Sequence, residues 1–235
     1  CLPYFDSPSV FAAVLDPQRG GKFGLRLADD YSGSQRYESR TNILVTRFSN
    51  NRDRFELIDF MPRYRRESGQ YHCPPDIIRY IRHISGKPEI RVDYDPRPAY
   101  ARGAAECEVR DEYIKHLTPK GAYESVYLYS DLDYPRIAQG DPIVIDRDCF
   151  LLLSYNQKLG DLNLDTILLE YEKTRVYWLD WSAKTRRFQR FNDEIIRSAL
   201  ALKLLSFEKT GAILAAVTTS LPEEIGAVRN WDYRY

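Results

Sequence analysis

Net charge and long apolar runs are both scarce in this sequence of 235 residues. The 34 lysine and arginine residues balance the 34 aspartate and glutamate residues. Because no overall positive field exists to hold a polyanion, we do not expect nucleic-acid binding. The longest apolar stretches, such as residues 150–153 and 211–217, fall far short of the roughly 20 residues that a membrane helix needs. The sequence therefore predicts a protein with neither a nucleic-acid nor a membrane partner.

Cysteine and histidine are too few and too dispersed to predict a metal or redox site. Cys1, Cys73, Cys107 and Cys149 lie far apart and form no Cys-x-x-Cys pair, and the chain has three histidines. A structural zinc site needs clustered ligands, so we interpret His72 beside Cys73 as part of a loop rich in tyrosine and proline. We predict no metal or other cofactor, and reduced thiols in a cytoplasmic protein.

The first 157 residues carry the pattern of antiparallel β structure, with short alternating runs separated by Gly, Pro, Asn and Asp. Residues 78–83 and 90–94 predict a hairpin closed at residues 85–88, and a further turn is predicted at residues 146–148. Residues 6–9 are expected to cap a short helix at residues 10–15. Further strands are predicted at residues 22–27, 43–49, 54–61, 123–130, 142–145 and 149–155. So many strands indicate a mainly β fold, a large antiparallel sandwich.

The apolar spacing becomes helical from about Asn163, with one apolar face over the following turns. A second helix is predicted to begin at about Asn192 as its N-cap and to end before Gly211. Between residues 199 and 205 only Lys203 is polar. A helix that is apolar on nearly all sides needs neighbours that a sandwich with two helices cannot supply. We therefore expect these neighbours to come from chain outside this sequence or from a partner.

Four stretches carry a resemblance to a known family: CLPYFDSPSVFAAVLDPQRGG, TRFSN with the nearby FELIDFMP, PEIRVDYDPRPAYAR and RSALALKLLSFEKTGAILAAVTTSLPEEIGAVRNWDYRY. Together they resemble bacterial members of glycoside hydrolase family 15, which includes glucoamylases, glucodextranases and trehalase-like proteins. The resemblance implies an N-terminal super-sandwich at residues 1–157, a helical linker at 158–190 and the start of a catalytic (α/α)6 barrel at 191–235. It also implies that the missing neighbours of the second helix are the other barrel helices.

The end of the chain resembles the part of the family that binds the terminal glucose. Tyr233 matches a family tyrosine of that subsite, whereas Trp231 departs from many relatives at its position. A glucosyl ring needs aromatic platforms for its faces and planar polar groups for its hydroxyls. Tyr235 could add a further platform. The predicted substrate-binding residues offer these two kinds of group, and they are Arg229, Asn230, Trp231, Asp232 and Tyr233. In the alternative interpretation, the aromatic residues fill the core of the barrel.

The resemblance implies an inverting α-glucoside hydrolase that releases glucose from α-glucans, isomalto-oligosaccharides or trehalose. In the family, an Arg-Asp pair and two catalytic glutamates lie further along, so we expect this chain to be a fragment that packs on its missing barrel and is inactive alone. Glu223 and Glu224 are interpreted as the start of a short helical turn, and Asp131 and Asp133 as parts of a solvated turn. The alternative function is a non-catalytic β-sandwich module that binds carbohydrate or packs on a partner.

Two other groups of residues have competing interpretations. Phe5, Asp6 and Ser7 match a family stretch near the junction of sandwich and barrel, but helix capping also accounts for Asp6 and Ser7. A run of tyrosines could form a carbohydrate platform in a stand-alone sandwich or could cover one face of a sheet. These tyrosines are Tyr123, Tyr127, Tyr129 and Tyr134.

Overall fold

Antiparallel sheets and three α-helices make up the part of the chain described by the computed structural model, which covers residues 1–5, 7–103, 105–118, 123–207, 210–214, 224 and 226. The largest sheet has the strand order β2 (Ser32–Tyr37), β3 (Leu44–Ser49), β4 (Arg54–Phe60), β7 (Ile77–Ser85), β13 (Cys149–Tyr155), β11 (Ser125–Ser130), β10 (Ile114–Leu117) and β9 (Glu106–Val109). A smaller sheet has the order β1 (Lys22–Arg26), β8 (Glu89–Asp95) and β12 (Ile143–Val144). Strands β5 (Tyr64–Arg65) and β6 (Tyr71–His72) form a separate hairpin.

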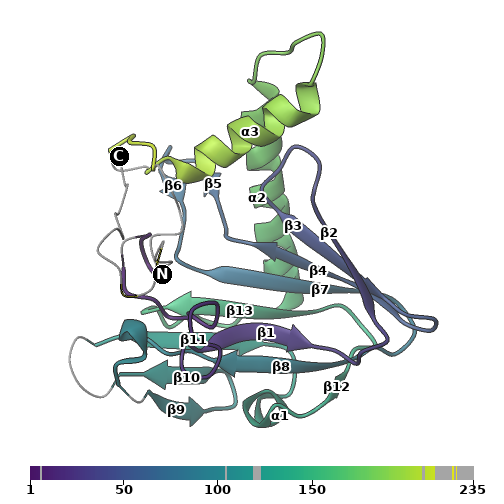
Figure 1. Cartoon of the computed structure of the whole chain (residues 1–235), viewed down its shortest axis with the longest axis vertical. Coiled ribbons are helices and arrows are strands. Elements are labelled where there is room, and N and C mark those ends of the chain that lie inside the picture. The colour runs from purple at the N-terminus through teal and green to yellow at the C-terminus, as the bar shows by residue number, and fades with distance from the viewer. Residues whose placement is uncertain are drawn as a thin grey trace.

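The helices are α1 (Tyr134–Gln139), α2 (Leu164–Ala183) and α3 (Asn192–Leu205), with one 3-10 turn at Ala99–Ala101. Figure 1 shows α2 running past the large sheet and α3 lying across one end of α2. The prediction of a mainly β, antiparallel fold with helices toward the C-terminal end is confirmed. No helix within the described ranges is both long enough and apolar enough to cross a membrane.

The large sheet is apolar on both faces and forms the middle of three layers. On one face, which we call the helix-side core, Ile58 and Phe150 pack with Tyr171 and Trp178 of α2. On the other face, the sheet-side core, Phe55 and its neighbours pack against the smaller sheet. All seven residues of β13 are buried, as expected for a strand covered on both sides. The two cores together hold α2 and the smaller sheet in place.

The predicted hairpin of residues 78–83 with 90–94 is wrong, because β7 and β8 belong to different sheets. β7 pairs with β4 and β13, whereas β8 pairs with β1 and β12. The alternation of Ile90 and Val92 gives β8 one apolar face, and that face covers Ile81 of β7 instead of extending its sheet. Gly86, with φ of +80°, allows the crossing, since a Cβ there would lie 2.2 Å from Oδ1 of Asp53.

The predicted turn at residues 146–148 likewise does not close a hairpin, because β12 pairs with β8 whereas β13 pairs with β7 and β11. The short helix expected at residues 10–15 is also wrong, since this segment forms turns. The hydroxyl of Ser7 accepts a hydrogen bond from the N–H of Tyr4 at 3.2 Å instead of capping a helix. Backbone bonds from Ala12 to Gly20 at 2.7 Å and from Ala13 to Gly21 at 3.1 Å hold the segment as a loop.

The two long helices differ in how they begin. Asn163 caps α2, and its Oδ1 accepts from the N–H of Thr166 at 2.9 Å. The N-cap position of α3 is Phe191 in the left-handed region, with φ of 60°, and no side chain caps this helix. The prediction of Asn192 as N-cap is therefore wrong, because its Oδ1 accepts from the N–H of Phe188 at 2.7 Å and so serves the preceding turn.

Candidate functional site

The predicted substrate-binding residues Arg229, Asn230, Trp231, Asp232 and Tyr233 lie outside the described residues, as does Tyr235. The described part of the chain does include residues that precede them, namely α3 and residues 206–207 and 210–214. These residues form the described part of the candidate site. Its components are the fixed side of α3, the open side of α3 and an aromatic cluster beyond the end of the helix.

One side of α3 is held by the loop between β2 and β3. Nδ2 of Asn42 donates to the carbonyl of Leu200 at 3.1 Å. The guanidinium of Arg197 donates to the carbonyl of Thr41 at 2.9 Å and lies 4.0 Å from the ring centroid of Tyr37. Leu200 is 1% exposed and joins the helix-side core. These contacts fix α3 relative to the large sheet.

The other side of α3 is apolar and open among the described residues. Leu202 lies on the side opposite Leu200 and is 52% exposed. Leu204, closer to the Leu200 side at the C-terminal end of the helix, and Ile213 beyond the helix are also 52% exposed. Several exposed large apolar side chains near one helix end indicate a surface that another element covers. Among the described residues, these side chains therefore have no covering neighbour, and whether the neighbours of α3 lie outside this sequence stays a prediction.

The chain reverses after α3 and meets the N-terminal segment. Ser206 and Ile213 form an antiparallel bridge, and the N–H of Phe207 donates to the carbonyl of Ala212 at 2.8 Å. The ring of Phe207 packs edge-on against Phe5 and Tyr4, with centroid distances of 5.3 and 6.5 Å. The structure thus places Phe5 beside the end of α3, where the segment that carries the predicted subsite begins. Asp6 lies outside the described residues.

The acidic residues considered in the sequence have structural partners where they are described. Asp133 caps α1 by accepting from the N–H of Arg136 at 2.8 Å. Asp131 accepts from the N–H of Phe150 at 3.0 Å and also pairs with Arg147. The segment forms a bend in which Asp133 is exposed, as predicted for a solvated turn, and both carboxylates also anchor the start of a helix or a strand. Glu224 is exposed, and Glu223 lies outside the described residues.

Two carboxyl groups have the raised pKa that a general acid requires, but both serve packing. Burial raises the pKa of Asp59, whose Oδ1 lies 3.4 Å from Nε of Arg79. The Arg79 guanidinium is itself 4.4 Å from the ring centroid of Phe23. Burial also raises the pKa of Asp76, which is 6% exposed. Asp76 is enclosed by its neighbours, whereas the side chain of Asp59 is 22% exposed and lies against Arg79.

The loop interpretation of His72 agrees with its contacts. Arg66 donates to Nδ1 of His72 at 2.7 Å, and Nε2 faces a carboxylate oxygen of Glu170 at 3.7 Å. The ring thus links the β5–β6 hairpin to α2. Across the described ranges, no group of three or more His, Cys, Asp or Glu side chains is arranged to hold a metal ion.

The tyrosine-rich strand covers a sheet face. Tyr127 and Tyr129 of β11 are buried in the helix-side core, 8% and 4% exposed. Tyr134 donates to the carbonyl of Glu112 at 2.8 Å, whereas Tyr123 is 62% exposed. The described tyrosines therefore form no continuous exposed platform.

Comparison with known proteins gives matches along the whole chain. Residues 1–131 match the family described as trehalase-like, N-terminal. A trehalase of Thermoplasma acidophilum is 33% identical over 247 residues, covering 100% of this chain and 41% of the relative. A trehalase of Thermoplasma volcanium is 32% identical over 245 residues, and one of Mycobacterium tuberculosis is 29% identical over 271 residues; each alignment covers 100% of this chain and 38% of the relative.

The chain thus spans about two fifths of the length of these curated relatives. No solved structure matches it significantly.

Proposed function

Because the chain belongs to the trehalase-like N-terminal family, we propose that it is the N-terminal part of an inverting α-glucoside hydrolase. The proposed substrate is trehalose, or an α-glucan or isomalto-oligosaccharide with a non-reducing glucose. The observation that carries the proposal is the similarity of the whole chain to proteins named trehalase. We also propose that this part alone has no turnover, and that it acts in a cytoplasmic enzyme without a cofactor.

The proposed architecture is a β super-sandwich at residues 1–157, a helical linker at 158–190 and the start of an (α/α)6 barrel at 191–235. Three observations support it. β13 is the last strand of the sheets, α2 follows it and packs on a face of the large sheet, and α3 leaves Leu202 and Leu204 half exposed. In the proposal, the other helices of the barrel cover these leucines.

The proposed substrate contacts are the terminal aromatic and polar residues from Arg229 to Tyr233. The position of Phe5 and Tyr4 against Phe207 supports a role for the N-terminal segment in positioning this region. Aromatic side chains fix neighbouring segments through large buried areas at small entropic cost. The N-terminal segment would then hold the start of the sugar-binding loop in place.

Glucose release by two purified proteins tests the proposal. One protein is this chain, and the other is the gene product extended to the length of the trehalase relatives. Each is incubated with trehalose, maltose, isomaltose and starch. We expect release only by the extended protein, and NMR of the first turnovers should show β-glucose, because a single displacement inverts the anomeric carbon.

The matched control is the double variant Glu223→Gln/Glu224→Gln of this chain. Turnover by the 235-residue chain that disappears in this variant would prove the proposal wrong. An extended protein that binds these sugars and hydrolyses none of them would support the alternative, a non-catalytic carbohydrate-binding module.

A further inference from the structure

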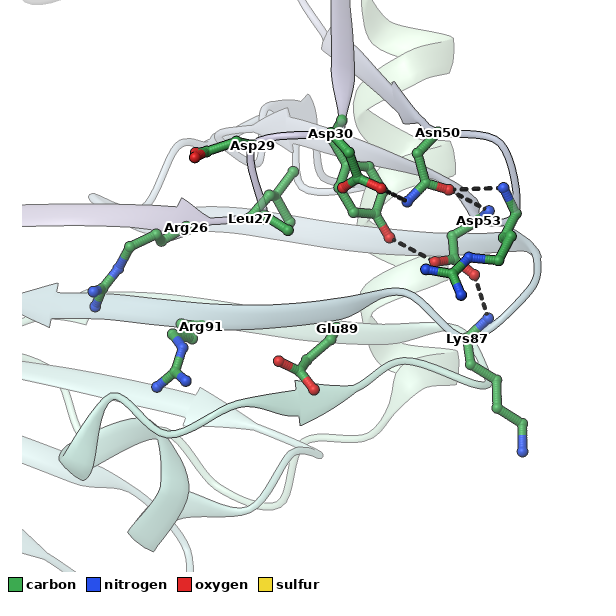
Figure 2. A pocket seen from close by; sticks show the side chains of 12 residues that line it. Arg26, Leu27, Asp29, Asp30, Asn50, Asp53, Lys87, Glu89 and Arg91 are labelled. Carbon is green, nitrogen blue, oxygen red and sulfur yellow. Dashed lines mark hydrogen bonds between the residues drawn. The ribbon is translucent and has the colours of Figure 1, made fainter.

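A polar cleft lies at one end of the smaller sheet, away from the end of α3. Its volume is about 780 Å³. Figure 2 shows that it is bounded by the end of β1, the start of β8 and the loops that precede β2 and β4. The lining residues are Arg26, Leu27, Ala28, Asp29, Asp30, Tyr31, Asn50, Arg52, Asp53, Lys87, Glu89 and Arg91.

The charges around this cleft balance. Four basic residues line it, and they are Arg26, Arg52, Lys87 and Arg91. Four acidic residues line it as well, and they are Asp29, Asp30, Asp53 and Glu89. Such a lining attracts neither an anion nor a cation strongly, but it offers many hydrogen-bond donors and acceptors. It therefore suits a neutral ligand that both donates and accepts hydrogen bonds.

One wall of the cleft is fixed by hydrogen bonds. The phenol of Tyr31 donates to Oδ2 of Asp53 at 3.0 Å, and the N–H of Lys87 donates to Oδ1 of Asp53 at 2.9 Å. Burial and the hydrogen bond to Asp53 raise the pKa of Tyr31 to about 12, so the phenol remains a donor. The ring also packs edge-on against Phe55 at 6.2 Å. The only aromatic ring among the lining residues is thus held rigidly.

Other polar groups of the cleft remain available to a ligand. Within the described residues, the side chains of Glu89 and Asp29 form no hydrogen bond and no ion pair within 4 Å. Figure 2 shows Glu89 and Arg91 projecting from the same side of β8. This is the side opposite Ile90 and Val92, which are buried. By contrast, Asp93 on the same face is engaged by Lys22 and Arg26, at 2.9 and 2.7 Å.

We propose that this cleft is a second carbohydrate site, which binds a neutral α-glucoside through its hydroxyls and is separate from residues 229–233. Carboxylates accept from sugar hydroxyls, guanidinium groups donate to them, and the fixed Tyr31 ring offers an apolar contact for a C–H face. A volume of 780 Å³ lies in the range of small-molecule sites. The choice of an α-glucoside rests on the proposed function. The role of the site is to retain substrate, and it involves no chemical step.

Residue-resolved NMR titration of this chain with trehalose and with maltose tests the inference. We expect saturable amide shifts around Tyr31, Asp53 and Glu89. In the isosteric double variant Asp29→Asn/Glu89→Gln, the shifts of these amides should give a dissociation constant about tenfold higher for each sugar. The variant weakens two charge-assisted hydrogen bonds to the ligand. Neither side chain has a structural partner among the described residues, so the fold should persist.

Two controls separate this cleft from the other predicted site. Glu106→Gln, on the edge strand β9, should leave all shifts unchanged. Trp231→Ala should affect only shifts near residues 229–235. Shifts confined to residues 229–235, or no shifts at all, would overturn the inference. Stronger shifts in the cleft with glycine than with either sugar would also overturn it, because a zwitterion is the other ligand of balanced charge. These readouts need no turnover, so failure of hydrolysis in the extended protein leaves them interpretable.

Discussion

Helices α2 and α3 follow each other in the chain and are both rich in apolar residues, but they are packed differently. α2 buries Ile167, Tyr171 and Trp178 against the large sheet. In α3, only Leu200 is buried, and Leu202 and Leu204 are half exposed. The difference teaches that apolar content alone does not show where a helix packs. α2 has its complementary surface within this chain, whereas the described part of the chain covers only one side of α3.

The largest effect is predicted for the substitution of Trp178, a buried residue by which α2 packs in the helix-side core. Trp178 is 4% exposed and packs edge-on against Tyr177 and Trp181, at 5.0 and 6.4 Å between ring centroids. We expect Trp178→Ala to lower the free energy of unfolding by about 3–5 kcal/mol, the range for buried large aromatic residues. Urea denaturation followed by circular dichroism measures it. Val176→Ala, at a position 58% exposed on the same helix, is the matched control, with an expected change of at most about 0.5 kcal/mol.

Equal losses for Trp178→Ala and Val176→Ala would show that both sides of α2 are covered in solution. The two helices would then not differ in the way described.

A matched pair of leucines tests α3 itself. Leu200→Ala should cost about 2–3 kcal/mol because this side chain is 1% exposed, whereas Leu202→Ala, at 52% exposure, should cost about 0.5 kcal/mol or less. In the extended protein, however, Leu202→Ala should become as costly as Leu200→Ala if the proposed barrel covers it. Hydrogen exchange of α3 and urea denaturation measure both proteins. An unchanged small cost of Leu202→Ala in the extended protein would contradict the proposed covering of α3.

Low pH should destabilise the fold through the buried His116. His116 is 9% exposed, its ring lies 5.1 Å from that of Tyr94, and its Nδ1 has no hydrogen-bond partner among the described residues. Burial lowers its pKa to about 4; the nearby Asp95 opposes this shift in part, and Arg97 adds to it. In the unfolded chain, His116 therefore binds a proton with a pKa of about 6.5, whereas in the folded chain it binds one only near pH 4. Stability should fall by about 2 kcal/mol as the pH drops from 6.5 to 4.

The His116→Gln variant isolates this contribution, since it removes the titrating group and keeps a polar side chain of similar size. Urea denaturation at several pH values measures both proteins. Between pH 6.5 and 4, the stability of the original chain should fall by about 2 kcal/mol relative to that of the variant. A constant difference over this range would exclude His116 as the source.

The sequence predicted the strands that have one clear apolar face, such as β8 with its buried Ile90 and Val92. It missed β2, because all six of its residues are exposed and Ser32–Tyr37 has no alternation to detect. The predictions of which strands pair with each other were wrong for β7 with β8 and for β12 with β13. The pairing of Val92 with Leu25 joins segments far apart in the sequence, and no local pattern encodes it. A short turn such as residues 85–88 therefore suggested a hairpin where the chain crosses between layers.

The candidate site could be predicted only in part, for a different reason. The aromatic residues near Tyr233 came from the resemblance, whereas the contact of Phe5 with Phe207 depends on tertiary structure. The cleft at Glu89 had no sequence signal, because its groups come from two strands and three loops. Glu89 and Arg91 lie on the face of β8 opposite the buried Ile90 and Val92, and no local pattern in the sequence shows that Tyr31 and Asp53 lie beside them.

The smallest effect is predicted for two asparagines, each of which stands where the sequence predicts the start of a helix. Asn163 and Asn192 both precede helical patterns, yet only Asn163 caps its helix, through Thr166. Asn163→Ala should therefore cost about 1 kcal/mol, the usual value of an N-cap. Asn192→Ala removes only the two hydrogen bonds between its side-chain amide and the backbone of Phe188, so it should cost less and should speed hydrogen exchange before α3 instead of along the helix. Equal losses, with exchange raised throughout α3, would mean that Asn192 does cap its helix in solution, because only a lost cap weakens all turns of the helix that follows it.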